Sequence, residues 1–206
     1  MKKILAFLLL ILAGFTIYWF LLRTKDSKPK AVKQEALSVQ KHTPLFNTSI
    51  DNLMNAYFEI KNAFVEADTA AAKQNTLLFI RLLDSIPVME LDKDSMMISE
   101  TAKSNIADIK ANALSLLQQS DITEMRQDFR TISDMLYPGF FKIINYEGPK
   151  LFLQNCPMAF DEDKDANWIS NSEEVINPYL GKKHPKFKGT MLHCGEVKDS
   201  IVPSNR

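Results

Sequence analysis

Apolar side chains recur at helical spacing over residues 47–137, and this pattern determines the fold class of the chain. In the first of four such segments Leu53, Tyr57, Ile60 and Phe64 follow one another at steps of four, three and four, which places them on one face of a helix. The connections between the four segments are short, and short connections favour antiparallel neighbours. The sequence therefore predicts a mainly α protein built on an antiparallel four-helix bundle.

Capping residues and prolines mark the ends of the predicted helices. Asp68 can cap the second helix, which ends before Pro87. The fourth helix opens with Asp121 and Glu124 at capping-box spacing, and Pro138 breaks it. These signals place the whole bundle before residue 140.

The residues after the bundle lack helical periodicity and favour short strands. Apolar and β-branched residues cluster near Gly148, and two short strands are predicted, one over residues 151–156 and one over residues 190–197. A long irregular stretch separates them. We therefore expect an irregular C-terminal segment, at about residues 146–200, that contains a short β-hairpin.

The N-terminal stretch from Ile4 to Leu22 is apolar over nineteen residues, with Thr16 as its single polar member. At a rise of 1.5 Å per residue, this length nearly matches a hydrocarbon core of about 30 Å. No A-x-A-like cleavage site follows the apolar stretch, so we expect an uncleaved transmembrane anchor over residues 1–23. Residues 24–46 are polar and carry no apolar period, which predicts a flexible tether, followed by the bundle domain and its Cys/Met segment over residues 47–206.

Charge and motifs exclude several classes of function. The formal net charge is zero, whereas a nucleic-acid-binding domain normally presents a basic face, so no nucleic acid is expected as a partner. The chain has none of the common motifs of hydrolases, nucleotide-binding proteins or zinc peptidases. We therefore expect no enzymatic activity.

Both cysteines of the chain lie in short C-terminal strings that also hold methionine and histidine. Thiolate, thioether and imidazole groups are the ligands that select Cu(I) and related soft metal ions over Mg²⁺ or Ca²⁺. The candidate ligands are Cys156, Met158, Met191, His193 and Cys194. Three other possibilities stay open from the residues alone: a disulfide that closes the 38-residue separation, two unconnected thiols, and a thiol enzyme that would need a reactive cysteine of low pKa.

The remaining methionines and histidines are expected to have ordinary roles. His42 and His184 stand in polar stretches and are predicted to be solvated, and Trp168 is predicted to anchor a loop. The six other methionines within residues 47–137 are assigned to structure and not to a metal site. They are Met54, Met89, Met96, Met97, Met125 and Met135. Met125 lies on a helical stripe, where packing is the usual role, and Met96 and Met97 stand in a predicted loop that is compatible with exposure.

Four C-terminal strings, read in order, carry a resemblance to a known family. They are NCPMAF at 155–160, ANWIS at 166–170, INPYLG at 176–181 and MLHCG at 191–195. Over roughly residues 48–200 the chain resembles an uncharacterised, mainly helical bacterial domain. That domain occurs alone behind an N-terminal export or anchor segment, or appended to periplasmic adaptor subunits of heavy-metal efflux systems. Cys156, Met158, Met191 and Cys194 match its motif, whereas residues 182–188 form an insertion before Met191.

The resemblance implies an extracytoplasmic location and a link to copper or other heavy metals. Charge counting alone leans the other way, toward a C-terminal part that stays inside, because seven basic residues flank the apolar stretch and most of them follow it. With the resemblance, the expectation is a single-pass inner-membrane protein with a periplasmic domain. That domain would bind Cu(I), and its partner would be a heavy-metal efflux adaptor or pump. The alternative is a disulfide-stapled interaction module that docks a membrane partner and binds no metal.

Overall fold

The computed structural model describes Leu37, residues 40–161 and residues 164–203 of the 206-residue chain. The chain divides into two compact units, residues 1–34 and 35–206, and the described residues belong to the second. The predicted anchor at residues 4–22 lies outside them, as does most of the predicted tether. Within the part that is described, no helix combines the length and apolar character needed to span a bilayer.

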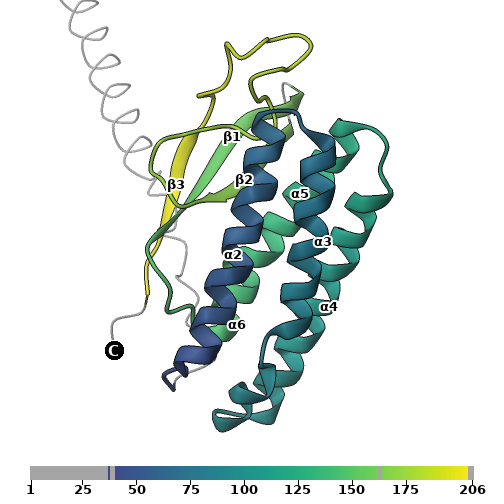
Figure 1. Ribbon diagram of the computed structural model, residues 1–206. Helices are drawn as coiled ribbons and strands as arrows, with labels where there is room; N and C mark the ends of the chain where they lie inside the picture. The colour runs from purple at the N-terminus through teal and green to yellow at the C-terminus, as the bar shows by residue number, and fades with distance from the viewer. Residues whose placement is uncertain (1–36, 38–39, 162–163, 204–206) are drawn as a thin grey trace, which may run out of the picture. The chain divides into compact units, whose positions relative to one another are not determined.

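Four helices of 13 to 23 residues form the larger part of the domain, as the periodicity predicted. They are α2 (Pro44–Val65), α3 (Thr69–Ser85), α4 (Met96–Gln118) and α5 (Ile122–Asp134). A 3-10 helix, η1 (Val88–Lys93), connects α3 to α4. Consecutive helices pack side by side and alternate in direction (Figure 1). The prediction of a mainly helical protein is confirmed.

Side-chain caps set the starts of these helices. Asp68 accepts a hydrogen bond from the Ala71 amide at the start of α3. Asp121 accepts from the second and third amides of α5, as the capping pattern predicted. Helix α2 begins at Pro44, earlier than the predicted start at residue 47, because Thr43 caps it and Pro44 is favourable in its first turn. The last residues of the predicted tether at 24–46 are therefore helical.

The bundle ends in a kink followed by one short helix. After α5 the chain forms a π-helical turn, η2 (Met135–Phe140), and then α6 (Phe141–Ile144). Tyr137 has extended backbone angles at φ −132° and ψ 130°, and Pro138 follows it directly. A residue before proline is pushed away from the helical region, which explains why the helical pattern breaks at this point.

A three-stranded antiparallel sheet follows, with the order β2-β1-β3. Its strands are β1 (Leu151–Asp161), β2 (Lys164–Ser170) and β3 (Glu196–Ile201). The predicted short β-hairpin is present as β1 and β2, and the strand predicted at residues 151–156 also pairs with the C-terminal strand β3, which begins later than predicted, at Glu196. The predicted second strand at 190–197 is largely a turn, with the Cys194 amide bonded to the Met191 carbonyl at 3.0 Å. Strand β2 was missed because its inner half is buried continuously and does not alternate.

Tyrosine hydroxyls join the outer edge of β2 to the rest of the domain. Strand β2 runs beside α2 and α5 (Figure 1). The Ile169 amide donates to Tyr57 Oη at 3.0 Å, and the Asn167 carbonyl accepts from Tyr179 Oη. Tyr57 lies 2.6 Å from Ser133 Oγ, which itself donates to the Phe129 carbonyl at 2.8 Å. These bonds satisfy backbone groups that an edge strand otherwise leaves unpaired.

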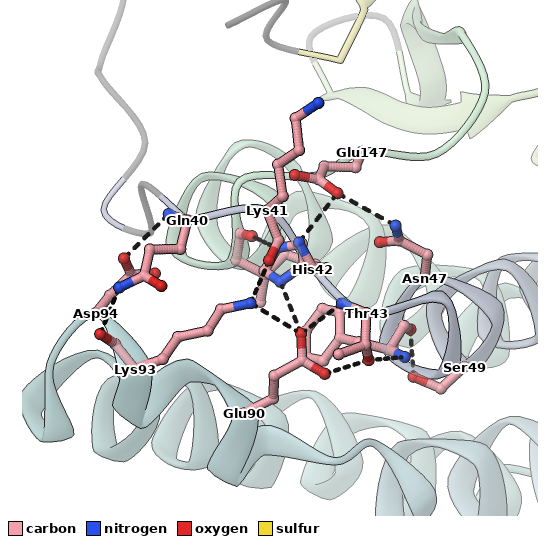
Figure 2. A network of polar contacts seen from close by, with 12 residues as sticks. Gln40, Lys41, His42, Thr43, Asn47, Ser49, Glu90, Lys93, Asp94 and Glu147 are labelled. Atoms are coloured by element: carbon pink, nitrogen blue, oxygen red, sulfur yellow. Dashed lines mark hydrogen bonds and ion pairs between the residues drawn. The ribbon is translucent and has the colours of Figure 1, made fainter.

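His42 is buried, and the prediction that it is solvated is wrong. Its side chain is 1% exposed, and its ring stacks on Phe46 at a centroid distance of 4.2 Å. Figure 2 shows the ring directed into a polar network, with Nε2 2.5 Å from the Ile144 carbonyl and Nδ1 3.6 Å from Glu90 Oε1. The polar neighbours of His42 in the sequence gave no sign of this burial, which long-range contacts produce.

Residues 40–43 are held to the bundle through the same network, which we call the N-terminal clamp (Figure 2). Thr43 donates from its amide and its hydroxyl to Glu90, at 2.7 and 2.5 Å. Lys93 Nζ donates to Glu90 at 3.0 Å and to the Lys41 carbonyl, and Gln40 Nε2 donates to the Lys93 carbonyl at 2.6 Å. Burial raises the pKa of Glu90, but the Thr43 bonds and the Lys93 charge outweigh burial and lower it.

Candidate thiol site

The two cysteines of the chain meet. Cys156 Sγ and Cys194 Sγ lie 2.7 Å apart, although the residues are 38 positions apart in the sequence. Cys156 is fully buried in the central strand β1, whereas Cys194 is partly exposed in the turn that precedes β3. Both are free thiols in this structure. We call Cys156 and Cys194 the thiol pair.

Gly195 allows the two segments to approach each other. Its φ is +135°, a conformation that residues with a side chain rarely adopt. A Cβ atom at this position would lie 2.5 Å from the Asn155 carbonyl oxygen and 3.1 Å from Trp168 Cη2. Any side chain here would push the turn off β1, so the glycine is a condition for the contact between the sulfurs.

Asn177 holds the turn in place from the other side. Its Nδ2 donates to the Cys194 carbonyl at 2.8 Å, and its backbone amide donates to the Leu192 carbonyl at 2.8 Å. Its Oδ1 accepts from the amides of Tyr179 and Leu180 at 2.8 and 3.0 Å. Asn177 is fully buried, so each of these bonds replaces a bond to water. One side chain therefore fixes the cysteine turn and the turn at residues 177–180 together.

The four strings that carry the family resemblance converge around the thiol pair. Trp168 and Tyr179 are both buried and meet edge to face at 5.8 Å. Asn155, next to Cys156, donates from Nδ2 to Asn167 Oδ1 at 2.9 Å. Tyr179 reaches the Asn167 carbonyl through its hydroxyl. Trp168 is a strand residue here, and the prediction that it anchors a loop is corrected accordingly.

The three other predicted ligands, Met158, Met191 and His193, are partly or fully exposed. Met158 is 36% exposed and follows Cys156 where an irregularity in the β1–β2 pairing changes the register. Met191 is partly buried against the core. His193 is exposed, and its Nδ1 lies 2.9 Å from the Val175 carbonyl. Among the described residues, no three His, Cys, Asp or Glu side chains gather as a metal-binding group, so His193 is not grouped with the two cysteines.

The environment keeps Cys194 protonated. Burial raises the pKa of its thiol, and the neighbouring Cys156 raises it further, because two thiolates in contact repel each other. Nucleophilic cysteines require the opposite shift, toward a lower pKa. Cys194 is therefore a weak nucleophile at neutral pH.

An open hollow of about 280 Å³ gives access to the pair from solvent. Its lining comes from β1, the cysteine turn and the start of β3, with Asn155, Pro157, Cys194, Gly195 and Glu196. Cys156 is absent from this lining. A small ion or molecule that enters the hollow therefore meets Cys194 first.

Two polar atoms near the pair are buried and lack a protein partner among the described residues. They are Gln154 Oε1 and Trp168 Nε1, an acceptor and a donor. Gln154 and Trp168 are directly opposite each other in the β1–β2 register, and Gln154 lies two positions before Cys156.

Several of these residues were missed by sequence reasoning. Asn177 and Gly195 position the thiol pair, and the signals were present: an Asn-Pro turn and a glycine directly after a cysteine. The assignment of six methionines to structure is correct for Met54 and Met125, which are buried. Met89, Met96 and Met97 are 60%, 72% and 76% exposed, and their assignment stays a prediction.

A protein-family model matches residues 53–144, and its family is described as "Protein of unknown function (DUF3347)". The match runs from within α2 to the end of α6, so it includes neither the sheet nor the thiol pair. The helical part of the chain is thus similar to an uncharacterised family, as the resemblance implied. The C-terminal strings and the association with efflux adaptors stay predictions. No curated protein and no solved structure matches the chain.

Proposed function

We propose that this chain is a membrane-tethered, extracytoplasmic domain whose reduced thiol pair binds one soft metal ion, with Cu(I) as the preferred ion. One observation carries the proposal: two thiols from distant segments meet at 2.7 Å beside an open hollow. Two thiolates are sufficient ligands for a soft monovalent ion, and they disfavour hard ions such as Mg²⁺ and Ca²⁺.

The chemistry of the donor set fits such an ion, provided that the sulfurs separate. A metal–thiolate bond is about 2.3 Å long, so two thiolates on opposite sides of one ion lie about 4.6 Å apart. In this structure they are 2.7 Å apart. Because Cys194 lies in a turn and Cys156 in a central strand, the turn is the part that has to shift. Metal binding also has to displace both thiol protons, since the thiolate is the ligand form.

Each residue then has a distinct role in the proposed site. Cys156 supplies a thiolate sheltered from solvent, and Cys194 supplies the accessible one. Met191, partly buried on the same turn, is the candidate thioether ligand, and Met158 is a second. His193 is the weakest of the candidate ligands, because its Nδ1 contacts the Val175 carbonyl and the structure does not group it with the two cysteines.

The location and the partner in this proposal rest on the sequence. The apolar stretch at residues 4–22 supports a single-pass anchor in the inner membrane. The resemblance to domains appended to heavy-metal efflux adaptors supports a periplasmic domain that sequesters the ion or passes it to an adaptor or pump. No catalytic step is part of this proposal.

The test is a competition titration of the full chain in mild detergent. After reduction with a phosphine and removal of oxygen, Cu(I) is titrated against bicinchoninate. We expect one tightly bound ion, an affinity at least 100-fold lower in Cys156→Ser and Cys194→Ser, and no change in Met96→Leu, whose side chain is exposed. Circular dichroism of each variant controls for folding. Equal affinity in wild type and both cysteine variants would contradict the proposal.

The short distance between the sulfurs favours a second candidate, a structural interaction module stapled by a Cys156–Cys194 disulfide. In that case the staple would hold the segment at residues 171–195 on the sheet, and a face of the domain would dock a membrane partner. This candidate predicts that the reduced full chain fails to compete with bicinchoninate for Cu(I), in the same titration.

A further inference from the structure

We infer that the thiol pair is a redox gate for its own metal site. In the oxidised state a Cys156–Cys194 disulfide closes the site, and in the reduced state the two thiols are available to a soft metal ion. This inference rests on the proposed function and adds its regulation. It makes the disulfide and the metal complex two exclusive states of one pair.

The position of the sulfurs lies between these two states. A disulfide bond is about 2.05 Å long, whereas two thiolates on opposite sides of one metal ion are about 4.6 Å apart. The observed separation of 2.7 Å requires a small approach to reach the first state and a larger withdrawal to reach the second. Neither change requires a rearrangement of the bundle, since both cysteines lie in the C-terminal segment.

The two cysteines differ in their freedom to move. Cys156 lies in β1, which pairs with β2 on one side and β3 on the other. Cys194 lies in a turn outside the sheet, which is held by the side chain and the backbone amide of Asn177 and lies close to β1 at Cys194 and Gly195. The hollow of about 280 Å³ is lined by Cys194 and Gly195 and opens beside this turn. Cys156 is therefore the fixed partner, and the turn at residues 191–195 moves between the states.

Oxidation needs a two-electron acceptor, and we assign this role to a small-molecule disulfide such as glutathione disulfide. The Cys194 sulfur, which solvent reaches, loses its proton and attacks the small disulfide, and the first small thiolate leaves. The Cys156 sulfur then loses its proton and attacks the mixed disulfide at Cys194, and the second small thiolate leaves. Two protein thiols become one disulfide, the oxidant becomes two thiols, and the two protons pass to the leaving thiolates.

The disulfide and the metal complex exclude each other because both use the same two sulfur atoms. A disulfide has no thiolate to offer a metal ion, and a metal-bound thiolate has given electron density to the ion, so it attacks the oxidant more slowly than a free thiolate. Bound metal should therefore protect the pair from oxidation, and oxidation should abolish metal binding.

The experiment uses the wild-type full chain in detergent, in two redox states, so no variant has to fold. One sample is oxidised with glutathione disulfide and desalted, and the other is reduced with a phosphine and desalted. Each is alkylated for intact mass and titrated anaerobically with Cu(I) against bicinchoninate. We expect no alkylation and at least 100-fold weaker binding in the oxidised sample, with full recovery after renewed reduction. Cu(I)-loaded protein should oxidise at least 10-fold more slowly than metal-free protein.

Two outcomes would overturn the gate. The first is a pair that keeps two alkylatable thiols after prolonged treatment with glutathione disulfide, and the second is an oxidised protein that binds Cu(I) as tightly as the reduced one. Failure of the reduced protein to bind Cu(I) would instead remove the proposed function, and the gate with it, even if the disulfide formed. Cys194→Ser, at the partly exposed position, serves as the control that forms no intramolecular disulfide. Met97→Leu, with an exposed side chain, should behave as wild type in every assay.

Discussion

Tyr57 Oη, on helix α2, accepts the amide hydrogen of Ile169 in strand β2 at 3.0 Å. Because Ser133 Oγ donates to the Phe129 carbonyl, the Tyr57 hydroxyl itself donates to Ser133 at 2.6 Å. Amide, phenol and hydroxyl thus form a directed chain of hydrogen bonds that runs from the sheet into the bundle. Burial is the main cause that raises the pKa of Tyr57, so the phenol stays protonated and keeps its donor.

Tyr57→Phe should destabilise the domain, because it leaves the buried Ile169 amide without a partner. An unsatisfied buried group costs about 1–3 kcal/mol, and we expect a loss of that size in urea-induced unfolding. Tyr137→Phe is the matched control, since Tyr137 donates to Asp199 at an exposed site and its loss should cost less than about 1 kcal/mol. Equal losses in the two variants would show that the sheet edge does not depend on Tyr57.

Gly195→Ala should separate the two sulfurs. The added methyl group would meet the Asn155 carbonyl at 2.5 Å, and the φ of +135° is strained for alanine, so the turn has to withdraw from β1. Strain of this kind costs about 1–3 kcal/mol per residue. We expect slower disulfide formation with glutathione disulfide, by at least 10-fold, measured by alkylation and mass. Gly139→Ala is the control, because its nearest neighbour lies at 3.7 Å, and it should oxidise at the wild-type rate.

Asn177→Ala should loosen the cysteine turn. The variant loses the bond to the Cys194 carbonyl and leaves two buried amides, those of Tyr179 and Leu180, without their acceptor. Alkylation of Cys194 in the reduced protein should therefore accelerate severalfold at constant pH, and stability should fall by about 1–3 kcal/mol. Asn171→Ala changes an exposed asparagine and should alter neither quantity. An unchanged alkylation rate in Asn177→Ala would show that the turn is held by other contacts.

Reduction should lower the melting temperature of oxidised wild-type protein. Closing a loop over a 38-residue separation stabilises by about 3–4 kcal/mol in the chain-entropy model. For a domain of this size the loss corresponds to about 10 °C. The melting temperature of Cys194→Ser should not respond to the reductant. A wild-type melting temperature that is equal in both redox states would contradict a stabilising disulfide.

Lys61 makes stability depend on pH in the alkaline range. Its residue is 6% exposed on α2, with Nζ 3.5 Å from Ser170 Oγ and 5.6 Å from the centroid of the Phe58 ring. Burial lowers the pKa of Lys61 from 10.5 to about 8. Below pH 8 the amine of Lys61 is charged in both the folded and the unfolded state, and the cost of removing this charge from water opposes folding. Between pH 8 and 10.5 the folded state loses the proton first, so stability should rise with pH.

Lys61→Met should therefore be more stable than wild type at neutral pH. The lowered pKa of Lys61 corresponds to a loss of about 3 kcal/mol at most in the stability of the wild type. The stability advantage of Lys61→Met should shrink between pH 8 and 10.5, because the wild-type amine loses its charge in this range. Urea unfolding of both proteins at several pH values measures this difference. Lys103→Met, at an exposed position beside Glu100, should show a pH-independent difference from wild type. A constant advantage for Lys61→Met across this range would argue against a charged, buried amine.

The helices were predictable from the sequence, and the sheet was only partly so. Asp68 and Asp121 cap their helices within three residues, so a local pattern is enough to find them. Strand β2 was missed because Trp168 and Ile169, which follow each other in its second half, are both buried. The strand therefore lacks the alternating pattern of buried and exposed residues. Its partners are on α2, α5 and the turn at residues 177–180, and such long-range contacts leave no local signal.

The site was predictable in its chemistry and not in its geometry. Residue types alone selected Cys156 and Cys194 as candidate ligands, and the structure brings these two sulfurs together. Met158 and His193 were predicted beside them from proximity in sequence, yet Met158 lies on the surface and His193 contacts Val175. The direction of a side chain in a turn depends on its tertiary contacts, and sequence spacing does not reveal these.

The N-terminal clamp also has a mechanical consequence. It joins residues 40–43 to η1, to the last residue of α6 and to Glu147, so a pull on the chain at Gln40 is shared among these contacts. The bonds from Thr43 to Glu90 and from Lys93 to the Lys41 carbonyl fasten residues 41–43 to η1, so they have to break before the first turn of α2 is freed. A domain held at this end can therefore bear tension along its chain without unwinding the helix on which its sheet is mounted.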